Sequence, residues 1–451
     1  MTEGVADANP WRSDRVFLAL SFAGLALRVV FAVWTDSFNR FLADDLLYLR
    51  QAEEWRQTGV LETGALERPP GYFGFLYLLS FLTGTGPTWH VVAKVIQAVA
   101  GAAAAIPVYA LGDRIAGRTA GRIATGLYAF DPTMIAYCGM LWPETLYTLL
   151  TMIVFWRTAL LEPGQIARPI ALGVLTGLAM LLKPAIGAFT VLLAISWLFR
   201  FGWGGAIRLS LVFAAATALV LAPWVVRNQM RYGPTILLEN EGAYNLWMSS
   251  HPGEPREVFD MWHRLPDPVA RASVGTEKGW KGIADDPGEW LRRSAVRGLS
   301  LWGLEWFITR NLALEAWGKI DVSTFLQWFW VLQLAYIPLL LSAAAGLRES
   351  WHDRHMKLLL SWMLVFTGVV AGLVATTRFR MPLHAMLAVL GGVGLTALAE
   401  RRLRLSDGIA VAAAVGLLIL SFQRPLFQRI TSGELTHVSQ LDDSRWVFFW
   451  Y

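Results

Sequence analysis

The sequence predicts an all-α polytopic membrane protein, and its bulk composition supports this class. Of the 451 residues, 55% are hydrophobic and only 16% are charged, whereas a soluble protein carries roughly 25% charged residues. The mean hydropathy is +0.44, and the 22 tryptophans are typical of chains whose aromatic rings lie at the membrane–water interface. Arginines in short loops between apolar segments explain the net charge of +5, so we expect membrane lipid and no nucleic acid as a partner.

About eleven transmembrane helices are expected, because a helix needs about 20 apolar residues to cross the bilayer. The stretch 70–82 is apolar but too short to span, so we expect it to lie along the membrane surface. The candidate spanning segments are 15–34, 89–111, 120–138, 144–161, 169–183, 184–199, 207–226, 323–346, 357–376, 383–399 and 407–422.

Basic residues in the short loops predict the orientation. The positive-inside rule requires 169–199 to be two short helices that meet at Lys183–Pro184, where the proline interrupts the helical pattern. We therefore expect a multi-pass protein of the cytoplasmic (inner) membrane, with an active site facing the periplasm or exterior. The basic residues placed in the cytoplasm are Arg114, Arg118, Arg122, Arg168, Arg200, Arg208, Arg348, Arg354, Lys357, Arg401, Arg402 and Arg404.

The same topology divides the chain into four parts. Residues 1–226 form an N-terminal transmembrane module, whose first outer loop (35–88) carries two adjacent acids, Asp44 and Asp45, and surface-lying helices. Residues 227–322 are polar and then amphipathic, which predicts a small outer cap. Residues 323–422 supply the C-terminal transmembrane helices, and 423–451 form an outer tail.

Two adjacent acids, Asp44 and Asp45, follow the first apolar segment in FLADDLLYLRQAEEW. Tyr48, Ala52 and Trp55 then recur with helical spacing, which predicts an amphipathic helix along the membrane. Asp44 is either the N-cap of this helix or a general base within reach of an acceptor hydroxyl. The first interpretation does not exclude the second.

A third acid, Glu144, opens a later transmembrane helix in WPETLY. The helix dipole favours a carboxylate there, so capping alone is an alternative to a catalytic role. Glu144 is expected to face the same compartment as Asp44 and Asp45. Acids that converge on one pocket can bind a divalent cation such as Mg²⁺ or Mn²⁺, with Asp45 and Glu144 as candidate ligands; no other cofactor is predicted.

Four cations fall at predicted outer helix ends, where the positive-inside rule makes them exceptions, and a fifth, Arg68, lies beside Pro69–Pro70 at the start of the surface segment. Such groups at headgroup depth suit a lipid phosphate, with anchoring at the interface as the alternative for each. Two of them, in RFRMPL, are two residues apart and are expected to project to one side of an extended stretch before a proline. The five are Arg68, Lys183, Arg227, Arg378 and Arg380.

The order of these motifs resembles that of the integral-membrane GT-C glycosyltransferases, in particular the protein O-mannosyltransferase and aminoarabinose-transferase type. In that family an acidic pair with a tyrosine follows the first helix, although many relatives carry Glu where this chain has Asp45. The similarity runs from about 15 to 400, and the matching stretches are Asp44-Asp45-x-x-Tyr48, Arg68-Pro69-Pro70, Glu144, Pro223-Trp224-Val225-Val226-Arg227-Asn228, Gly242-Ala243-Tyr244-Asn245 and Arg378-Phe379-Arg380-Met381-Pro382.

The resemblance implies an inverting transferase that moves a sugar from a polyprenyl-phosphate lipid to a hydroxyl of a glycan, a lipid or a protein. Asp44 matches the family's catalytic base. Arg378 and Arg380, with Lys183, are then expected to hold the lipid phosphate and stabilise its growing charge. His384 is a lone histidine, for which a structural role is the alternative. The side chains assigned to substrate binding are Tyr48, Tyr72, Trp142, Tyr244, Asn245 and His384.

Two other classes stay open as alternatives. A lipid or glycan transporter is expected to carry ionisable residues near mid-membrane, in paired repeats with broken helices, whereas this sequence concentrates them at helix edges and shows no repeat. An O-antigen polymerase or ligase of another fold does not need the acid pair. The sequence has no P-loop, HExxH or GxSxG signature, so a nucleotide-using enzyme is not predicted.

Overall fold

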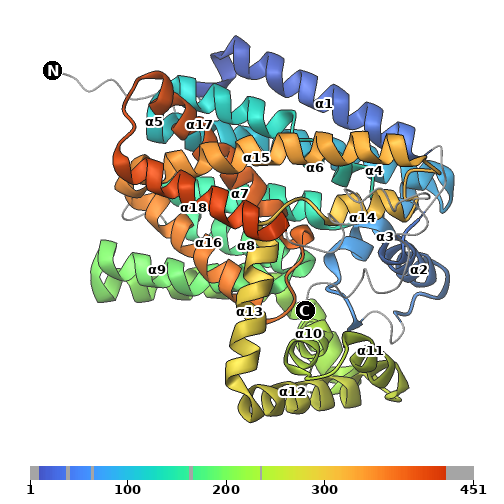
Figure 1. Cartoon of the computed structure of the whole chain (residues 1–451). Helices are drawn as coiled ribbons and strands as arrows, with labels where there is room; N and C mark the ends of the chain where they lie inside the picture. The colour runs from blue at the N-terminus through green and yellow to red at the C-terminus, as the bar shows by residue number, and fades with distance from the viewer. Residues whose placement is uncertain (1–9, 37–40, 62–65, 162–165, 234–235, 423–451) are drawn as a thin grey trace.

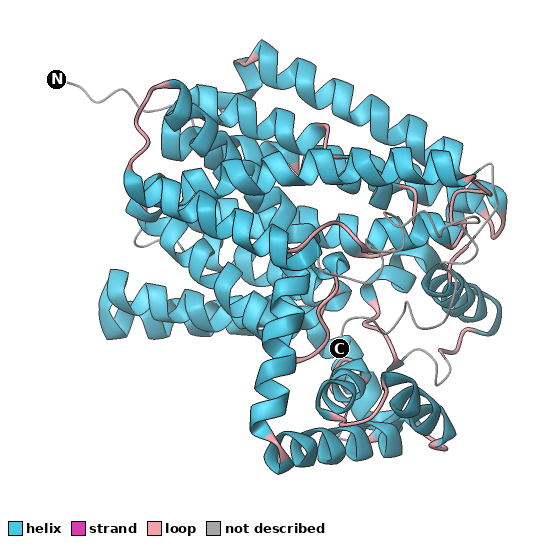
Figure 2. Ribbon diagram, viewed as in Figure 1, coloured by secondary structure: helices cyan, strands magenta, loops and turns pink. Residues whose placement is uncertain are grey.

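The computed structural model describes residues 10–36, 41–61, 66–161, 166–233 and 236–422, and every regular element in these ranges is a helix (Figures 1 and 2). The predicted all-α class is therefore confirmed, while the predicted tail at 423–451 lies outside the described residues. The 3-10 helices are η1 (Pro10–Ser13), η3 (Pro184–Ile186) and η4 (Thr377–Arg380). The α-helices are α1 (Arg15–Asp36), α2 (Ala43–Thr58), α3 (Gly71–Thr83), α4 (Pro87–Ala103), α5 (Ala105–Ala129), α6 (Pro132–Cys138), α7 (Glu144–Ala159), α8 (Ala167–Leu182), α9 (Gly187–Tyr232), α10 (Glu241–Ser250), α11 (Pro255–Arg264), α12 (Pro268–Asp285), α13 (Pro287–Trp302), α14 (Phe307–Ala313), α15 (Val322–His352), α16 (Arg354–Gly372), α17 (Met381–Ala399) and α18 (Leu405–Phe422).

Six helical stretches among the described residues are long and apolar enough to cross a membrane, and three shorter apolar helices accompany them. This count is lower than the eleven predicted segments for two reasons. Two of the stretches each contain a reversal of the chain, and α7, α8 and α18 are shorter than a full span. The short helix α3 corresponds to the segment predicted to lie along the surface.

The long helix α9 is a hairpin of two arms. Its backbone leaves the helical region at Gly202, where φ is 68°, a value that suits glycine. The rings of Trp197 and Phe213 lie 5.8 Å apart across the two arms, although a continuous helix would separate those residues by roughly 24 Å. A similar break occurs in α5 at Gly117, where φ is 79°. The arms of α9 thus match the two separate segments predicted for this region.

One predicted span, 120–138, is interrupted in the structure. Helix α5 ends at Ala129, and α6 restarts with Asp131 as its N-cap, whose carboxylate accepts the backbone amides of Thr133 and Met134. An aspartate followed by a proline is a strong helix-start signal. The apolar pattern, considered alone, does not show this new helix start.

The basic loops and the acid pair lie at opposite ends of the bundle. Asp14, just before α1, pairs with Arg122 at 2.8 Å, and Arg114 pairs with Asp353 at 3.5 Å. From there the 22 residues of α1 extend roughly 33 Å to Asp36, shortly before α2. This separation is the one that the positive-inside pattern predicts.

The turn at Lys183 lies at the same end as the acid pair. Helix α8 ends at Leu182, Lys183 is extended, and η3 leads the chain into α9. The Thr217 hydroxyl donates to the Gly173 carbonyl at 3.0 Å, and further along both helices Gly177 packs closely on Val220. Helix α8 is therefore parallel to the second arm of α9, as two short helices meeting at Lys183–Pro184 require.

Helices α10 to α13 form a small cap beside one end of the bundle (Figure 1). Its core contains the buried side chains of Trp247, Met248, Val258 and Trp262. Helix α13 returns to the bundle, where the Trp290 indole donates to the Gly372 carbonyl at 3.1 Å. Helix α14 packs into the main core instead, so the folded cap is smaller than the predicted segment 227–322.

Close contact between α15 and α17 gives a first testable prediction. A Cβ added to Gly346 would lie 2.0 Å from the Leu390 carbonyl oxygen, so the two helices would have to move apart. We expect Gly346→Ala to lower the free energy of unfolding by about 1–3 kcal/mol, measured by thermal unfolding in detergent. Gly368→Ala, where a Cβ meets open space, is the matched control, and equal melting of the two variants would contradict the packing described.

Candidate active site

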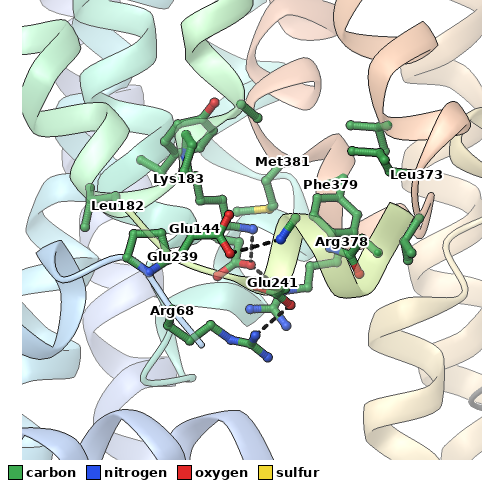
Figure 3. Close-up of a pocket in the computed structure, with 18 of the residues that line it drawn as sticks. Arg68, Glu144, Leu182, Lys183, Glu239, Glu241, Leu373, Arg378, Phe379 and Met381 are labelled. Carbon is green, nitrogen blue, oxygen red and sulfur yellow. Dashed lines mark hydrogen bonds and ion pairs between the residues drawn. The ribbon is translucent and has the colours of Figure 1, made fainter. Parts of the chain in front are cut away.

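Six charged side chains form one continuous row of ion pairs at the end of the bundle beside the cap; all of them except Asp44 are labelled in Figure 3. Glu241 pairs with Arg68 at 2.6 Å, and Arg68 pairs with Asp44 at 3.4 Å. Arg378 contacts both Asp44 and Glu144, and Glu144 also pairs with Lys183 at 2.7 Å. Acids and bases alternate, so the row is neutral overall. These residues, Glu241, Arg68, Asp44, Arg378, Glu144 and Lys183, are called the charge row below.

Every member of the charge row comes from a helix end or from the turn beside one. Prolines help to place these ends: Pro70 precedes α3, Pro143 precedes α7 and Pro184 opens η3. Proline fits the start of a helix and is disfavoured in its interior. Segments far apart in the sequence therefore end at one site, and each presents a charged side chain there.

The two adjacent aspartates have different environments. Asp45 accepts the backbone amide of Leu42 at 2.8 Å and that of Leu141 at 2.7 Å. It thus closes the N-terminus of α2 and ties it to the turn before α7. Burial raises the pKa of Asp45 to about 6, against the lowering effect of these two amides. The sequence alternative that Asp44 caps α2 is not what the structure shows, since Leu42 is the N-cap and Asp45 makes the capping bond.

Asp44 is free of backbone hydrogen bonds among the described contacts and faces the two arginines instead. Burial raises its pKa, but the charges of Arg378 and then Arg68 outweigh burial and hold the pKa of Asp44 well below the ordinary value. Its side chain is 20% exposed. Asp44 is therefore a carboxylate whose basicity depends on where Arg378 and Arg68 point.

Glu144 is buried between two cations, Lys183 and Arg378. The Arg378 guanidinium also lies 4.2 Å from the centre of the Trp142 ring, and the Lys183 ammonium lies 4.9 Å from that of Phe379. Aromatic faces attract cations, so these rings orient the two cations together with Glu144. Trp142, predicted to bind substrate, thus lies beneath Arg378.

A cavity of about 310 Å³ adjoins the charge row. Its polar side carries every member of the row except Asp44, which Arg68 and Arg378 cover, together with Glu239. Its opposite wall is apolar and comes from α16 and the residues that follow it, including Phe366, Val370 and Leu373. Tyr48 and Asn245, both predicted to bind substrate, also line it. The cavity therefore combines a charged side with an apolar side.

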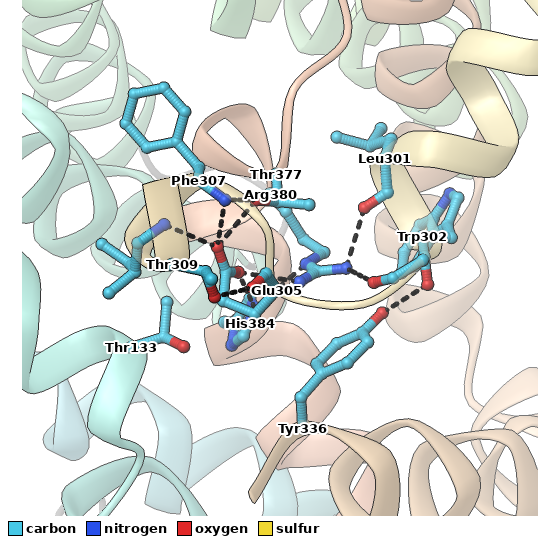
Figure 4. Close-up of polar contacts among 12 residues, drawn as sticks. Thr133, Leu301, Trp302, Glu305, Phe307, Thr309, Tyr336, Thr377, Arg380 and His384 are labelled. Carbon is cyan, nitrogen blue, oxygen red and sulfur yellow. Dashed lines mark hydrogen bonds and ion pairs between the residues drawn. The ribbon is translucent and has the colours of Figure 1, made fainter. Parts of the chain in front are cut away.

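Arg380 does not line this cavity, although it was predicted to act beside Arg378. It is fully buried and pairs with Glu305 at 2.8 Å (Figure 4), and it donates to the carbonyls of Leu301 and Gly303 at 2.9 and 2.5 Å. The expectation assumed an extended backbone. The segment instead forms the 3-10 helix η4, in which residues two apart point in different directions.

Glu305 ties the turn before α14 to η4. One carboxylate oxygen accepts the amides of Phe307 and Ile308 and the hydroxyl of Thr377 at 2.7 Å, and the other accepts from Arg380. His384 follows in the same network, in contact with Arg380 at 3.0 Å and with Asp131 at 2.8 Å. His384 thus lies in a buried structural network behind the cavity.

Three other predicted residues lie outside the cavity lining. Arg227 donates to the Leu61 carbonyl at 2.7 Å and stacks over Trp224. The Tyr72 hydroxyl donates to Gln97 at 2.6 Å. Tyr244 belongs to the cap and contacts the Trp262 ring edge-on.

A divalent cation does not fit the predicted ligand pair in this arrangement. Both oxygens of Asp45 accept backbone amides, and Glu144 contacts two cationic side chains. Over the ranges that the structure describes, no group of three or more His, Cys, Asp or Glu side chains is placed to hold a metal. We therefore assign no chemical step to a metal.

Sequence reasoning missed three acids near the site. Glu239 and Glu241 line the cavity from the start of the cap, and Glu305 is buried behind it. The signal for Glu305 was available, because a single acid within the apolar stretch SLWGLEWFI needs a buried partner. No comparable pattern marks Glu239 and Glu241, because their position depends on how the cap folds over the bundle.

The family comparison covers part of the N-terminal half of the chain. Residues 67–226 match the model described as dolichyl-phosphate-mannose-protein mannosyltransferase. This range includes Arg68, Glu144 and Lys183 of the charge row. No curated protein sequence matches the chain.

Two solved oligosaccharyltransferase structures share the fold. The Archaeoglobus fulgidus oligosaccharyltransferase, in a complex with Zn and sulfate, aligns with a TM-score of 0.52 and 17% identity over 94% of this chain and 53% of that chain. The archaeal oligosaccharyltransferase AglB from the same organism, in complex with an inhibitory peptide and a dolichol-phosphate, aligns with a TM-score of 0.50 and 16% identity over 94% and 56%. ArnT from Cupriavidus metallidurans, bound to undecaprenyl phosphate, gives a TM-score of 0.41 and 16% identity over 85% and 77%.

The chain spans little more than half the length of the oligosaccharyltransferases. At these identities the likeness concerns the fold, which agrees with the family match in the N-terminal half. The chain is therefore similar to the dolichyl-phosphate-mannose-protein mannosyltransferase family over residues 67–226, and it shares the fold of the Archaeoglobus fulgidus oligosaccharyltransferase.

Proposed function

We propose that the chain transfers a sugar from a polyprenyl-phosphate carrier to an acceptor hydroxyl, at the outer face of the cytoplasmic membrane. The observation that carries this proposal is the cavity itself, in which Arg68, Lys183 and Arg378 face an apolar wall from α16. A carrier lipid has matching parts, a charged phosphate and an apolar chain. The match to a dolichyl-phosphate-mannose-dependent family and the dolichol-phosphate in the AglB structure support this class of donor.

The charged residues have separate roles in this proposal. Arg378 and Lys183 bind the donor phosphate and stabilise the charge that grows on it as the bond to the sugar breaks. Asp44 accepts the proton of the acceptor hydroxyl, while the oxygen of that hydroxyl forms the new bond to the anomeric carbon. The electron pair of the broken bond leaves with the lipid phosphate, and attack in one step inverts the anomeric centre. Asp45 is a positioning residue, since it fixes the start of α2.

The charge row makes the base responsive to the donor. Arg378 and Arg68 hold the pKa of Asp44 low, and a carboxylate of low pKa is a weak base. A donor phosphate competes for the same arginines and draws them away from Asp44. The pKa of Asp44 then rises toward its ordinary value, so the base becomes effective when the donor is bound.

The test is consumption of donors by the purified chain in proteoliposomes. Undecaprenyl- and dolichyl-phosphate-linked hexoses and pentoses are supplied with glycan, lipid and serine/threonine-peptide acceptors, and UDP- and GDP-linked sugars form a parallel arm. We expect at least one carrier-linked sugar to yield free lipid phosphate and a product of inverted configuration, with no use of nucleotide sugars. Movement of the carrier lipid across the bilayer without its consumption would favour a transporter and overturn the proposal.

Glu239 predicts a pH dependence of donor binding. Burial and then the neighbouring charge of Glu241 raise the pKa of Glu239 to about 7, so below that pH it is protonated and neutral. Above it, Glu239 adds a negative charge to the cavity that repels the donor phosphate. We expect donor affinity to fall about fivefold as pH rises from 6 to 8, which corresponds to roughly 1 kcal/mol.

The Glu239→Gln variant separates this effect from others. The donor phosphodiester carries one charge throughout the range, so the variant, which cannot ionise, is expected to bind with a flat pH profile. Isothermal titration of the donor at several pH values measures the affinity of the wild type and of the variant. A variant that keeps the wild-type slope would assign the titration to another group.

A further inference from the structure

We propose that a second, smaller cleft in the cap binds a sugar ring of a glycan acceptor; this proposal rests on the transferase function proposed above. The cleft has a volume of about 130 Å³ and lies between residues 67–68, the start of α10 and helix α11. One side is aromatic and the other is polar. It is called the cap cleft below.

The aromatic side offers ring faces and edges to a ligand. Tyr244 and Trp262 contact each other edge-on with centres 5.3 Å apart, and Phe259 lies against His263 with centres 4.1 Å apart. Phe259 lines the cap cleft, and 45% of this residue is exposed. A pyranose ring has C–H faces that are apolar and a rim of hydroxyls, so it packs on aromatic faces while its rim stays polar.

The polar side contains an acceptor that needs a partner. Asn240 is 2% exposed, and its side-chain oxygen has no hydrogen-bond partner among the described residues. Leaving a buried acceptor unpaired is costly. A hydroxyl of a bound sugar supplies the missing donor, and the carboxylates of Glu67 and Glu241 on the same side accept further hydroxyls.

The cap cleft adjoins the catalytic cavity through one ion pair. Arg68 and Glu241 line both spaces, and Arg68 also contacts Asp44 at 3.4 Å. A sugar held in the cap cleft therefore lies on the far side of the Arg68–Glu241 pair from the base. The next sugar of the same glycan is placed to present its hydroxyl to Asp44. A small polar and aromatic cleft of this kind favours a glycan acceptor over a lipid chain.

Binding of soluble oligosaccharides tests the proposal without any turnover. The full chain is purified in a detergent without a sugar head group and mixed with mannotriose, isomaltotriose or cellotriose. Saturation-transfer NMR reports contact with the ring C–H protons, and isothermal titration gives the dissociation constant. We expect at least one trisaccharide to bind, and Phe259→Ala to weaken it about tenfold, with Phe259→Tyr close to wild type.

Three comparisons test whether binding is specific to the cap cleft: the Trp280→Ala variant, a serine/threonine peptide and the Asp44→Asn variant. Trp280→Ala removes an exposed aromatic side chain of α12 that is not part of the cap cleft, and it is expected to bind as wild type does. Binding of no trisaccharide, or equal binding by Phe259→Ala, would overturn the proposal. So would a serine/threonine peptide that binds in place of the sugars and is lost in Phe259→Ala. Asp44→Asn is expected to keep sugar binding, so a failed catalytic assignment is distinguishable from a failed cap cleft.

Discussion

Asp44→Asn is expected to lower the rate of sugar transfer by about 100-fold or more, the effect of losing a general base. The amide keeps the size of the side chain but cannot accept the acceptor proton. Donor binding is expected to persist, because the substitution removes a negative charge from beside Arg378 and Arg68. Release of free lipid phosphate from the carrier-linked sugar measures the rate, and titration of the donor measures the affinity.

The matched control for this substitution is Asp260→Asn. Asp260 is exposed on α11, outside the cavity lining, and the chemical change is the same. We expect it to leave transfer unchanged. If Asp44→Asn consumed the donor as fast as the wild type, Asp44 would serve only to hold the two arginines, and the base would have to be sought among the acids that line the cavity.

Glu305→Gln is expected to cost the fold about 3–5 kcal/mol, the range for removing one partner of a buried ion pair. The substitution leaves the fully buried Arg380 without its counter-charge, and it weakens the turn that Glu305 ties to Thr377. Chemical unfolding in detergent measures the change. Glu277→Gln alters an exposed acid of the cap and serves as the control, with little expected effect.

A second variant tests the assignment of Arg380. The double substitution Glu305→Gln with Arg380→Met removes the unpaired charge, so it is expected to recover part of the lost stability. If Arg380 instead bound the lipid phosphate, as the sequence predicted, Arg380→Met would weaken donor binding strongly and change stability little. The two measurements on one set of proteins separate these roles.

The sequence could place the candidate site because its residues lie at helix ends. The apolar pattern predicts where spans stop, and Asp44, Glu144, Lys183 and Arg378 all follow from those stops and the positive-inside rule. The common depth of these ends does not depend on details of packing. Membrane helices are constrained to cross the same slab, so ends on one face are brought to one level.

The remaining contacts depend on local geometry that the pattern does not contain. Arg380 turns away from Arg378 because η4 is helical rather than extended. Asp131 reaches His384 only because α5 and α6 are separated by a break. Glu241 meets Arg68 because the cap folds back over the first outer loop. These are interactions between distant segments, which a single sequence does not reveal.

The neutrality of the charge row has a consequence for repeated turnover. A donor phosphodiester carries one negative charge, whereas the carrier left after transfer is a phosphate monoester with nearly two. If the proposed function holds, Arg378 and Lys183 are expected to hold the spent carrier more tightly than the incoming donor, and the spent carrier is expected to act as a product inhibitor. The steady rate in a membrane is then expected to depend on how quickly that lipid is cleared and recycled, so that transfer would be coupled to the supply of carrier.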